Sequence, residues 1–435
     1  MKKRLLLLSL LMCVCMMMLT PYASAKRKVI NKNGCHIVNG VLEKYTGKIK
    51  YGKKIVLPKE VKAIGKEAFS VYNYVDDESQ ITDTMKNCHM KLKVDSNIKI
   101  NKRAFNECFS IDVTYGEGLK ILNSNYRVTP AIGVYCKVYL PKTLRVIKKN
   151  GLRCYMSKFW GDDNSLIERS QEVRIYLNKG LKVIEEGGLA KAIIDKKLPE
   201  TIEVIGDYTF ADAVFVESDI DYPEKVKGII YPEMPNNLKS IGAYVFNPNL
   251  HRSFASEYTI NIPAAVENID VRVFSKSSGK TPCVKYKVDK KNKVYSNDEN
   301  GWLYSKDKKT LYWANIEKAE TVIQDTVENI EFLAFNRLYR NQPSQESDNI
   351  NIYMPKKLKK MSRYIGEYMY DYTLHFATKK APKLTTRNTD DIYEYRRDKI
   401  LWGNSSVVVP KGSKEEYVKK WKITDKKCER VLVKD

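Results

Sequence analysis

A short motif recurs along almost the whole chain, beginning with IVLPKEVKAIGKEAF at Ile55 to Phe69. Counted from Pro58, it places apolar residues at plus three, plus six and plus eleven, a glycine at plus seven and a small residue at plus ten. The same frame returns, complete or degraded, at eight further anchors: Val94, Pro141, Asn178, Pro199, Pro235, Pro263, Gln324 and Pro355. A unit of this size cannot bury its own apolar face, so the copies must stack and share one core. The repeat therefore predicts a solenoid.

Short alternating runs precede many of these anchors. Apolar and polar residues alternate in the runs at Cys136 to Leu140, Val173 to Leu177, Ile260 to Ile262 and Ile350 to Met354. Period two with one apolar face is typical of a half-buried strand. We therefore predict a mostly β fold in which each coil contributes a strand, a proline turn and a compact Val-x-x-Ile segment that ends at Phe. The strands would stack into a parallel ladder.

Two features indicate β-hairpins outside the regular coils. Asn39-Gly40 separates two short apolar stretches near the N-terminus, which is the pattern of a tight hairpin turn. We expect this hairpin to cap the first coil. The segment GWLYSKDKKTLYW, with a charged turn at Lys306 to Lys309, predicts an inserted hairpin that protrudes from the solenoid or covers one edge.

The C-terminal segment resembles a small cap. A strand and proline turn at SVVVPKG precede a short predicted helix, in which Ser413 is placed to cap the N-terminus and Glu416 occupies the capping-box position. Tyr417 and Trp421 are four residues apart and would share one face. Two polar stretches, Asp76 to Asn87 and Thr385 to Arg397, are predicted to be loops.

The first residues read as an export signal. Lys2, Lys3 and Arg4 precede an apolar run that ends at Leu19, and Ala23-Ser24-Ala25 has the small-x-small form of a cleavage site. The run falls short of the roughly 20 apolar residues that span a bilayer. We expect cleavage after Ala25, no transmembrane segment afterwards, and a secreted or extracellular chain that associates with a cell surface or remains free. The predicted division is a signal peptide at 1–25, a solenoid at 26–400 and a C-terminal cap at 401–435.

The charge balance is strongly basic. The net charge of +24 becomes +21 once the three positive charges of the signal are removed. Such an exterior could bind teichoic acid or other anionic polymers by counterion release, or the lysines could simply solubilise a repeat protein and blunt its sheet edges. We do not expect nucleic acid as a partner, because the chain carries no recognition module.

Seven cysteines remain after cleavage, and their odd number and scattered positions argue against a disulfide framework. Cys108 occupies a position that is apolar in other copies, so we place it in the core. Whether any cysteines pair is left open by the sequence.

Catalytic and metal-binding motifs are not evident in the sequence. Its four histidines do not pair at metal-ligand spacing, and Cys88-His89 with Cys108 would lack a fourth zinc ligand. Neither a GxSxG elbow nor an HExxH motif occurs. We therefore assign no catalytic, cofactor-binding or metal-binding residues. An enzyme whose groups converge from distant coils stays open as an alternative.

The outward face of the strand ladder is the candidate binding surface. Alternation points one set of side chains away from the core, and several of them are types favoured in protein-binding surfaces. The predicted ligand-binding residues are Lys137, Tyr139, Arg174, Tyr176, Thr259, Asn261, Asn351 and Tyr353. Tyrosines also suit strands for structural reasons, so this face could equally be structural.

Three stretches together resemble the BspA-like leucine-rich repeat proteins of bacteria. They are NGVLEKYTG with the repeat at Pro58, VDKKNKVYSNDENGWLYSKDKKTL with the repeat at Gln324, and the closing VVVPKGSKEEYVKKW. The spacing is irregular and proline is lost at Val94, Asn178 and Gln324, so the number of coils is open. The resemblance implies an exported or surface-displayed solenoid, with some members acting as adhesins, and no common catalytic site.

The leading hypothesis is therefore a secreted or cell-surface binding protein, an adhesin that recognises a host or bacterial extracellular protein or glycan. A basic wall-associated protein held by anionic polymers is the alternative, followed by an enzyme with a cryptic site.

Overall fold

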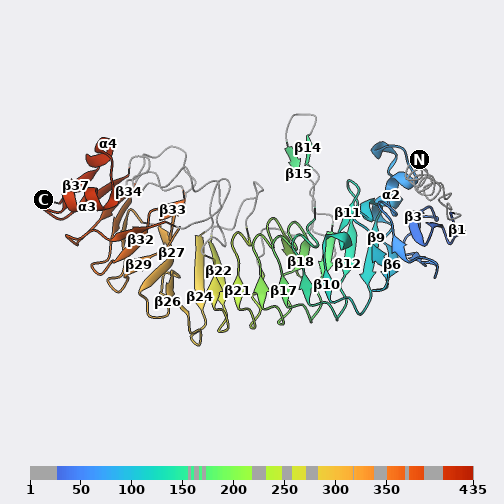
Figure 1. The fold of residues 1–435 in the computed structure, drawn as a ribbon, viewed down its shortest axis with the longest axis horizontal. Helices are drawn as coiled ribbons and strands as arrows, with labels where there is room; N and C mark the ends of the chain where they lie inside the picture. Colours follow the sequence, from blue (N-terminus) through green and yellow to red (C-terminus); the bar gives the residue numbers. More distant parts are fainter. Residues whose placement is uncertain are drawn as a thin grey trace, which may run out of the picture.

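The computed structural model describes residues 27–154, 158–160, 166–168, 173–217, 232–246, 257–270, 283–316, 318–337, 350–367, 372–386 and 405–434. The predicted signal peptide at 1–25 lies outside them. The coils stack along one axis into an elongated solenoid, with the N-terminal coils at one end and the C-terminal coils at the other (Figure 1). Strands dominate and helices are few and short, which confirms the predicted mostly β repeat fold.

Strands that precede the proline turns form a parallel ladder, here called the long ladder. Its buried and exposed positions alternate, as in β6, where Met90, Leu92 and Val94 are buried and the lysines between them are exposed. Among the described residues the ladder is divided into three sheets. The first contains β4 (Lys54–Ile55), β6 (Met90–Val94), β9 (Ile111–Tyr115), β12 (Cys136–Tyr139), β16 (Val173–Tyr176), β18 (Ile193–Asp195) and β20 (Val214–Val216); the second β22 (Glu257–Ile262) and β24 (Cys283–Val288); the third β28 (Glu320–Val322), β31 (Ile350–Tyr353), β34 (Tyr372–His375), β36 (Ser406–Val409) and β37 (Val431–Val433).

The Val-x-x-Ile segments form a second parallel ladder, which the sequence did not predict as a separate sheet. Most of its strands are two residues long, and the second residue is usually buried, as Ile205 is in β19. This short ladder contains β5 (Ala63–Ile64), β7 (Lys99–Ile100), β10 (Ile121–Leu122), β13 (Val146–Ile147), β17 (Val183–Ile184), β19 (Val204–Ile205), β21 (Ser240–Ile241), β23 (Asn268–Ile269), β29 (Asn329–Ile330), β32 (Lys360–Ser362) and β35 (Lys383–Thr385). Each coil thus pairs with its neighbours on two sides.

The turn that follows the short strand shares one backbone shape in most frames of the repeat. Its residue at plus nine takes a positive φ in seven of the eight frames in which the structure describes that residue, with values between 50° and 65°: Glu67, Arg103, Asn150, Gly187, Tyr208, Tyr244 and Leu333. The glycine at plus seven meets the neighbouring coil, because a Cβ on Gly242 would lie 2.6 Å from the backbone nitrogen of Asp207. That contact leaves no room for a larger residue.

The phenylalanines that end the repeats stack on each other inside the solenoid. Phe69 lies parallel to Phe105 at a centroid distance of 5.5 Å, and Phe210 lies near Phe246 at 6.0 Å. Cys108 is fully buried among them, as predicted. Two large apolar clusters result, one running from the N-terminal cap to the insertion and one from the insertion to the C-terminal cap.

The N-terminal hairpin is confirmed. Strand β2 (Cys35–Val38) pairs antiparallel with β3 (Val41–Tyr45) and with β1 (Val29–Lys32). The turn residues Asn39 and Gly40 have φ values of 51° and 81°, the left-handed pair that this turn requires. Strand β3 then pairs with the first short strand, β5, and so closes the end of the core.

The inserted hairpin forms at the predicted residues but neither protrudes nor merely covers an edge. Strands β25 (Tyr295–Asn297), β26 (Leu303–Ser305) and β27 (Thr310–Ile316) make an antiparallel meander, and β27 continues into the short ladder by pairing with β29. Trp313 packs into the first apolar cluster and Tyr304 into the second. The hairpin therefore joins the two cores.

The remaining elements connect coils or close the C-terminus. They are the 3₁₀ helices η1 (Val71–Asn73), η2 (Glu78–Gln80) and η3 (Ser124–Tyr126), the α-helices α2 (Asp83–Asn87), α3 (Lys414–Trp421) and α4 (Asp425–Cys428), and the strands β8 (Phe105–Cys108), β11 (Val128–Pro130), β14 (Lys158–Trp160), β15 (Leu166–Glu168), β30 (Phe335–Arg337) and β33 (Gly366–Glu367). Within the described ranges, no helix has the length and apolar character needed to cross a membrane.

Two local predictions need correction. The stretch at Asp76 to Asn87 contains η2 and α2 rather than loop alone, because Asp77 and Thr82 cap these helices with their side chains. Ser413 precedes α3 but makes no side-chain cap; its hydroxyl donates to the carbonyl of Pro410 at 2.6 Å instead. Of the predicted loop at 385–397, residues 387–397 lie outside the described residues.

Candidate functional site: the exposed face of the long ladder

A groove of about 940 Å³ lies over the N-terminal part of the long ladder. We call it the ladder groove. Lys91 and Lys93 of β6, Thr114 of β9 and Tyr139 of β12 line it from the sheet, and Lys54 lines it from β4. Alternation along the strands places these side chains on the outward face. Asp95, which pairs with Lys93 at 3.5 Å, and Asp112 also line the groove, so its lysines outnumber its carboxylates. The ring of Tyr139 lies at one side.

The predicted residues of β12 and β16 come together beside this groove. Lys137 lies opposite Arg174 in the parallel register, and Tyr139 lies opposite Tyr176. The two tyrosine rings stack with their centroids 4.6 Å apart and an angle of 4° between their planes. Half-buried, stacked rings present a rigid surface that loses little conformational entropy on binding.

Arg174 is a correction to the predicted binding face. Alternation places it on the outward side of β16, yet only 1% of it is exposed. Its guanidinium donates to the Asp195 carboxylate at 2.6 Å and lies 4.9 Å from the ring centre of Tyr176. A ligand cannot reach this side chain, so Arg174 positions Tyr176 rather than binding a partner.

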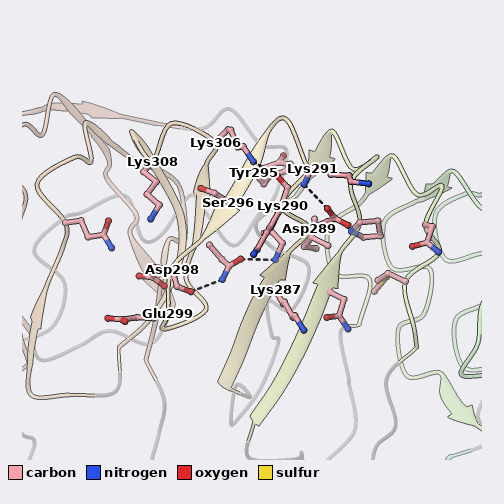
Figure 2. Close-up of a pocket in the computed structure, with 18 residues that line it drawn as sticks. Lys287, Asp289, Lys290, Lys291, Tyr295, Ser296, Asp298, Glu299, Lys306 and Lys308 are labelled. Carbon is pink, nitrogen blue, oxygen red and sulfur yellow. Dashed lines mark hydrogen bonds between the residues drawn. The ribbon is translucent and has the colours of Figure 1, made fainter.

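Thr259 and Asn261 lie apart from this group, on β22 of the second sheet. Both are exposed, and in the parallel register they lie opposite Lys285 and Lys287 of β24. Asn261 lines a second hollow of about 1050 Å³ between the ends of β22 and β24 and the inserted meander (Figure 2). We call this hollow the insertion groove.

Asn351 and Tyr353 form a third group, on β31. The Asn351 side-chain oxygen lies 2.8 Å from Nε2 of His375, and the Tyr353 ring stacks on His375 at a centroid distance of 4.6 Å. Burial lowers the pKa of His375, and the positive charge of Lys434 lowers it further. The imidazole is therefore biased toward its neutral form, in which Nε2–H can donate to Asn351.

The structure thus sorts the eight predicted residues into three groups rather than one row. Sequence reasoning also missed the lysines of the ladder groove. Their signal was present, because Lys91 and Lys93 alternate with buried Met90, Leu92 and Val94. This run lies before Cys136, where the alternating runs that we assign to the ladder begin.

Cys88 and His89 make hydrogen bonds to Ser110 and Asp112. His89 Nδ1 lies 3.0 Å from the Asp112 carboxylate, and the Cys88 thiol donates to the carbonyl of Ser110 at 3.0 Å. Among the described residues, no group of three or more His, Cys, Asp or Glu side chains is placed to hold a metal ion.

Parallel two-sided coils, capped ends and grooves on the strand face define a leucine-rich-repeat solenoid. Residues 190–293 match the family model described as "BspA type Leucine rich repeat region (6 copies)". The resemblance inferred from the sequence is therefore confirmed for these repeats. Among solved structures, the crystal structure of the pneumococcal vaccine antigen PcpA is similar, with 14% identity, coverage of 94% of this chain and 99% of that chain, and a TM-score of 0.40. No curated protein matches the chain.

Proposed function

We propose that this chain is a secreted or cell-surface binding protein, an adhesin that recognises an extracellular protein or glycan through the ladder groove. The observation that carries the proposal is the groove itself, a hollow of about 940 Å³ lined by several lysines and by Tyr139, whose ring stacks on Tyr176. Concave sites with a few converging polar groups and rigid aromatic rings are typical of binding surfaces. The BspA-type repeats and the signal-like N-terminus support a surface or extracellular location.

Binding of the chain from Lys26 to Asp435 to a panel of matrix proteins, plasma proteins and glycans tests this proposal. The variant Tyr139→Ala/Tyr176→Ala should lose at least tenfold in affinity for the ligand identified. The matched control is Tyr208→Ala/Tyr244→Ala, which removes another stacked pair, with centroids 4.9 Å apart, at the turns after the short ladder. Equal effects of both variants, or full binding by the first, would contradict the assignment of the groove.

Salt separates this proposal from its alternative, a basic protein held at the wall by anionic polymers. The alternative is favoured by Lys54, Lys59, Lys62 and Lys91 in the groove, none of which forms an ion pair with a described residue. Saturable binding to one protein or glycan that survives high salt supports the adhesin. Binding only to polyanions, lost as salt rises, supports the alternative. We propose that the chain acts without catalysis, and turnover of any substrate would contradict that.

A further inference from the structure

The insertion groove concentrates positive charge at the junction of the two cores. Lys287, Lys290 and Lys291 approach it from the end of β24 and the following turn, and Lys306 and Lys308 from the turn between β26 and β27 (Figure 2). Four of the five are exposed and Lys308 is half-buried. None of the five forms an ion pair with any residue that the structure describes.

Some lysines elsewhere in the coil stack pair with carboxylates of neighbouring coils. Glu203 lies 3.0 Å from the ammonium of Lys182 and 2.8 Å from that of Lys239. Glu328 pairs in the same way with Lys309 and Lys359. The repeat can therefore supply a partner carboxylate across coils, and it does not do so for the five lysines of the insertion groove.

Two of the three acidic residues that line the groove, Asp289 and Asp298, accept hydrogen bonds from the turns around them. Asp289 accepts the backbone N–H of Lys291 at 2.8 Å. Asp298 accepts the N–H of Trp302 at 2.9 Å and the hydroxyl of Tyr304 at 3.2 Å. These carboxylates hold turns in shape, so the ammonium groups keep their capacity to bind an anion from outside.

The lysine-bearing turn is fixed to the solenoid. Asn292 is only 1% exposed, and its amide donates to the carbonyls of Pro263 and Val266, each at 2.9 Å. Across the groove, the ammonium of Lys306 donates to the carbonyl of Lys290 at 3.0 Å. Because hydrogen bonds already hold both walls in place, ligand binding would lose little conformational entropy in ordering them.

We propose that the insertion groove binds a segment of a linear acidic polysaccharide. The lysines would contact its carboxylate or sulfate groups, and Asn236, Asn261 and Gln324, which also line the groove, would bond its hydroxyls. Exposed Glu299 would accept bonds from sugar hydroxyls, and together with Asp289 and Asp298 it would repel closely spaced phosphates. The mixed lining therefore favours a sugar chain with spaced charges over a phosphodiester polymer. The site is separate from the ladder groove and rests on the proposed extracellular location.

The test measures binding of polygalacturonate oligosaccharides to the chain from Lys26 to Asp435 at two salt concentrations. The variant Lys287→Ala/Lys290→Ala/Lys291→Ala should lose at least tenfold in affinity. The control Lys182→Ala/Lys239→Ala/Lys359→Ala removes the same net charge from ion-paired positions and should lose less than threefold. Thermal unfolding of each variant checks that it is folded.

Two further arms decide the ligand class and the site. Poly(glycerol phosphate) should bind more weakly than polygalacturonate, and the variant Tyr139→Ala/Tyr176→Ala should bind polygalacturonate as the unchanged chain does. Equal losses of affinity in both lysine variants would mean that polygalacturonate responds only to the net charge of the chain, and this would overturn the proposal. No binding by the unchanged chain, or tighter binding of poly(glycerol phosphate), would also overturn it. A loss of affinity only in the tyrosine variant would assign polysaccharide binding to the ladder groove and overturn the proposed site.

Discussion

Arg174 and Asp195 form an ion pair across two adjacent strands of the long ladder, with 2.6 Å between the guanidinium and the carboxylate. Arg174 is 1% exposed, whereas the Asp195 side chain keeps 29% of its surface in solvent. Without Asp195, this buried guanidinium would lose a charged partner in a medium of low polarity, which is costly.

Asp195→Ala should therefore destabilise the protein more than an ordinary surface change. We expect a loss of about 2 to 4 kcal/mol in the free energy of unfolding, somewhat below the cost of breaking a fully buried pair because Asp195 is partly exposed. Arg174→Met keeps much of the volume, removes the buried charge and should cost less. Urea denaturation of both variants checks this, and a smaller loss for Asp195→Ala than for Arg174→Met would contradict the role given to the pair.

Phe210→Ala tests the register of the repeat. The ring is 2% exposed and lies 5.2 Å from Phe215 and 6.0 Å from Phe246, measured between centroids. Its removal should cost about 3 to 5 kcal/mol, because the surrounding coils cannot collapse into the cavity. Tyr51, which is 76% exposed, serves as the control, and Tyr51→Ala should change stability by less than about 0.5 kcal/mol. An unchanged denaturation midpoint for Phe210→Ala would disprove the register.

Arg103→Gly should stabilise the protein, against the usual effect of glycine. Arg103 is exposed and has a φ of 64° at the plus-nine position. The left-handed conformation costs a non-glycine residue about 1 to 2 kcal/mol, and glycine loses about 0.5 to 1 kcal/mol of backbone entropy. A net gain of about 0.5 to 1 kcal/mol follows. The neighbouring Lys102→Gly, at a residue without positive φ, should destabilise; chemical denaturation giving the same sign for both would refute this account.

His375 should make stability depend on pH in mild acid. Burial, helped by Lys434, lowers its pKa in the folded state below the usual 6.5. As the pH falls, His375 therefore takes up a proton in the unfolded chain at a higher pH than in the folded protein. The stability that neutral His375 contributes is complete above about pH 6.5 and is lost as the pH falls toward the folded-state pKa. His375→Gln should flatten the curve in that window. Denaturation midpoints measured from about pH 7.5 to pH 5 check this; identical slopes for both proteins would exclude His375 as the cause.

Much of the fold could be predicted because the repeat imposes the same physical requirement many times. Apolar residues at fixed offsets must meet in one core, and this places Phe210 and Cys108 correctly. Asn39-Gly40 located the first hairpin because few other residues adopt its backbone shape. The plus-nine turn escaped prediction because residues such as Glu67, Tyr208 and Leu333 give no local sign of a positive φ. At this position the neighbouring coils, and not the local sequence, impose the positive φ.

The candidate site was less predictable, since alternation indicates which side of a strand a residue faces but not what covers it. By itself the sequence determined the stacking of coils, the core residues, the capping hairpin and the basic character of the chain. Only the tertiary structure decided that Arg174 is buried against Asp195, that Tyr139 stacks on Tyr176, and that lysines from separate segments converge in two grooves. The physical reason is that the pattern of buried and exposed residues in a strand follows from that strand's own sequence. Ion pairing, ring stacking and concavity depend instead on which coils become neighbours.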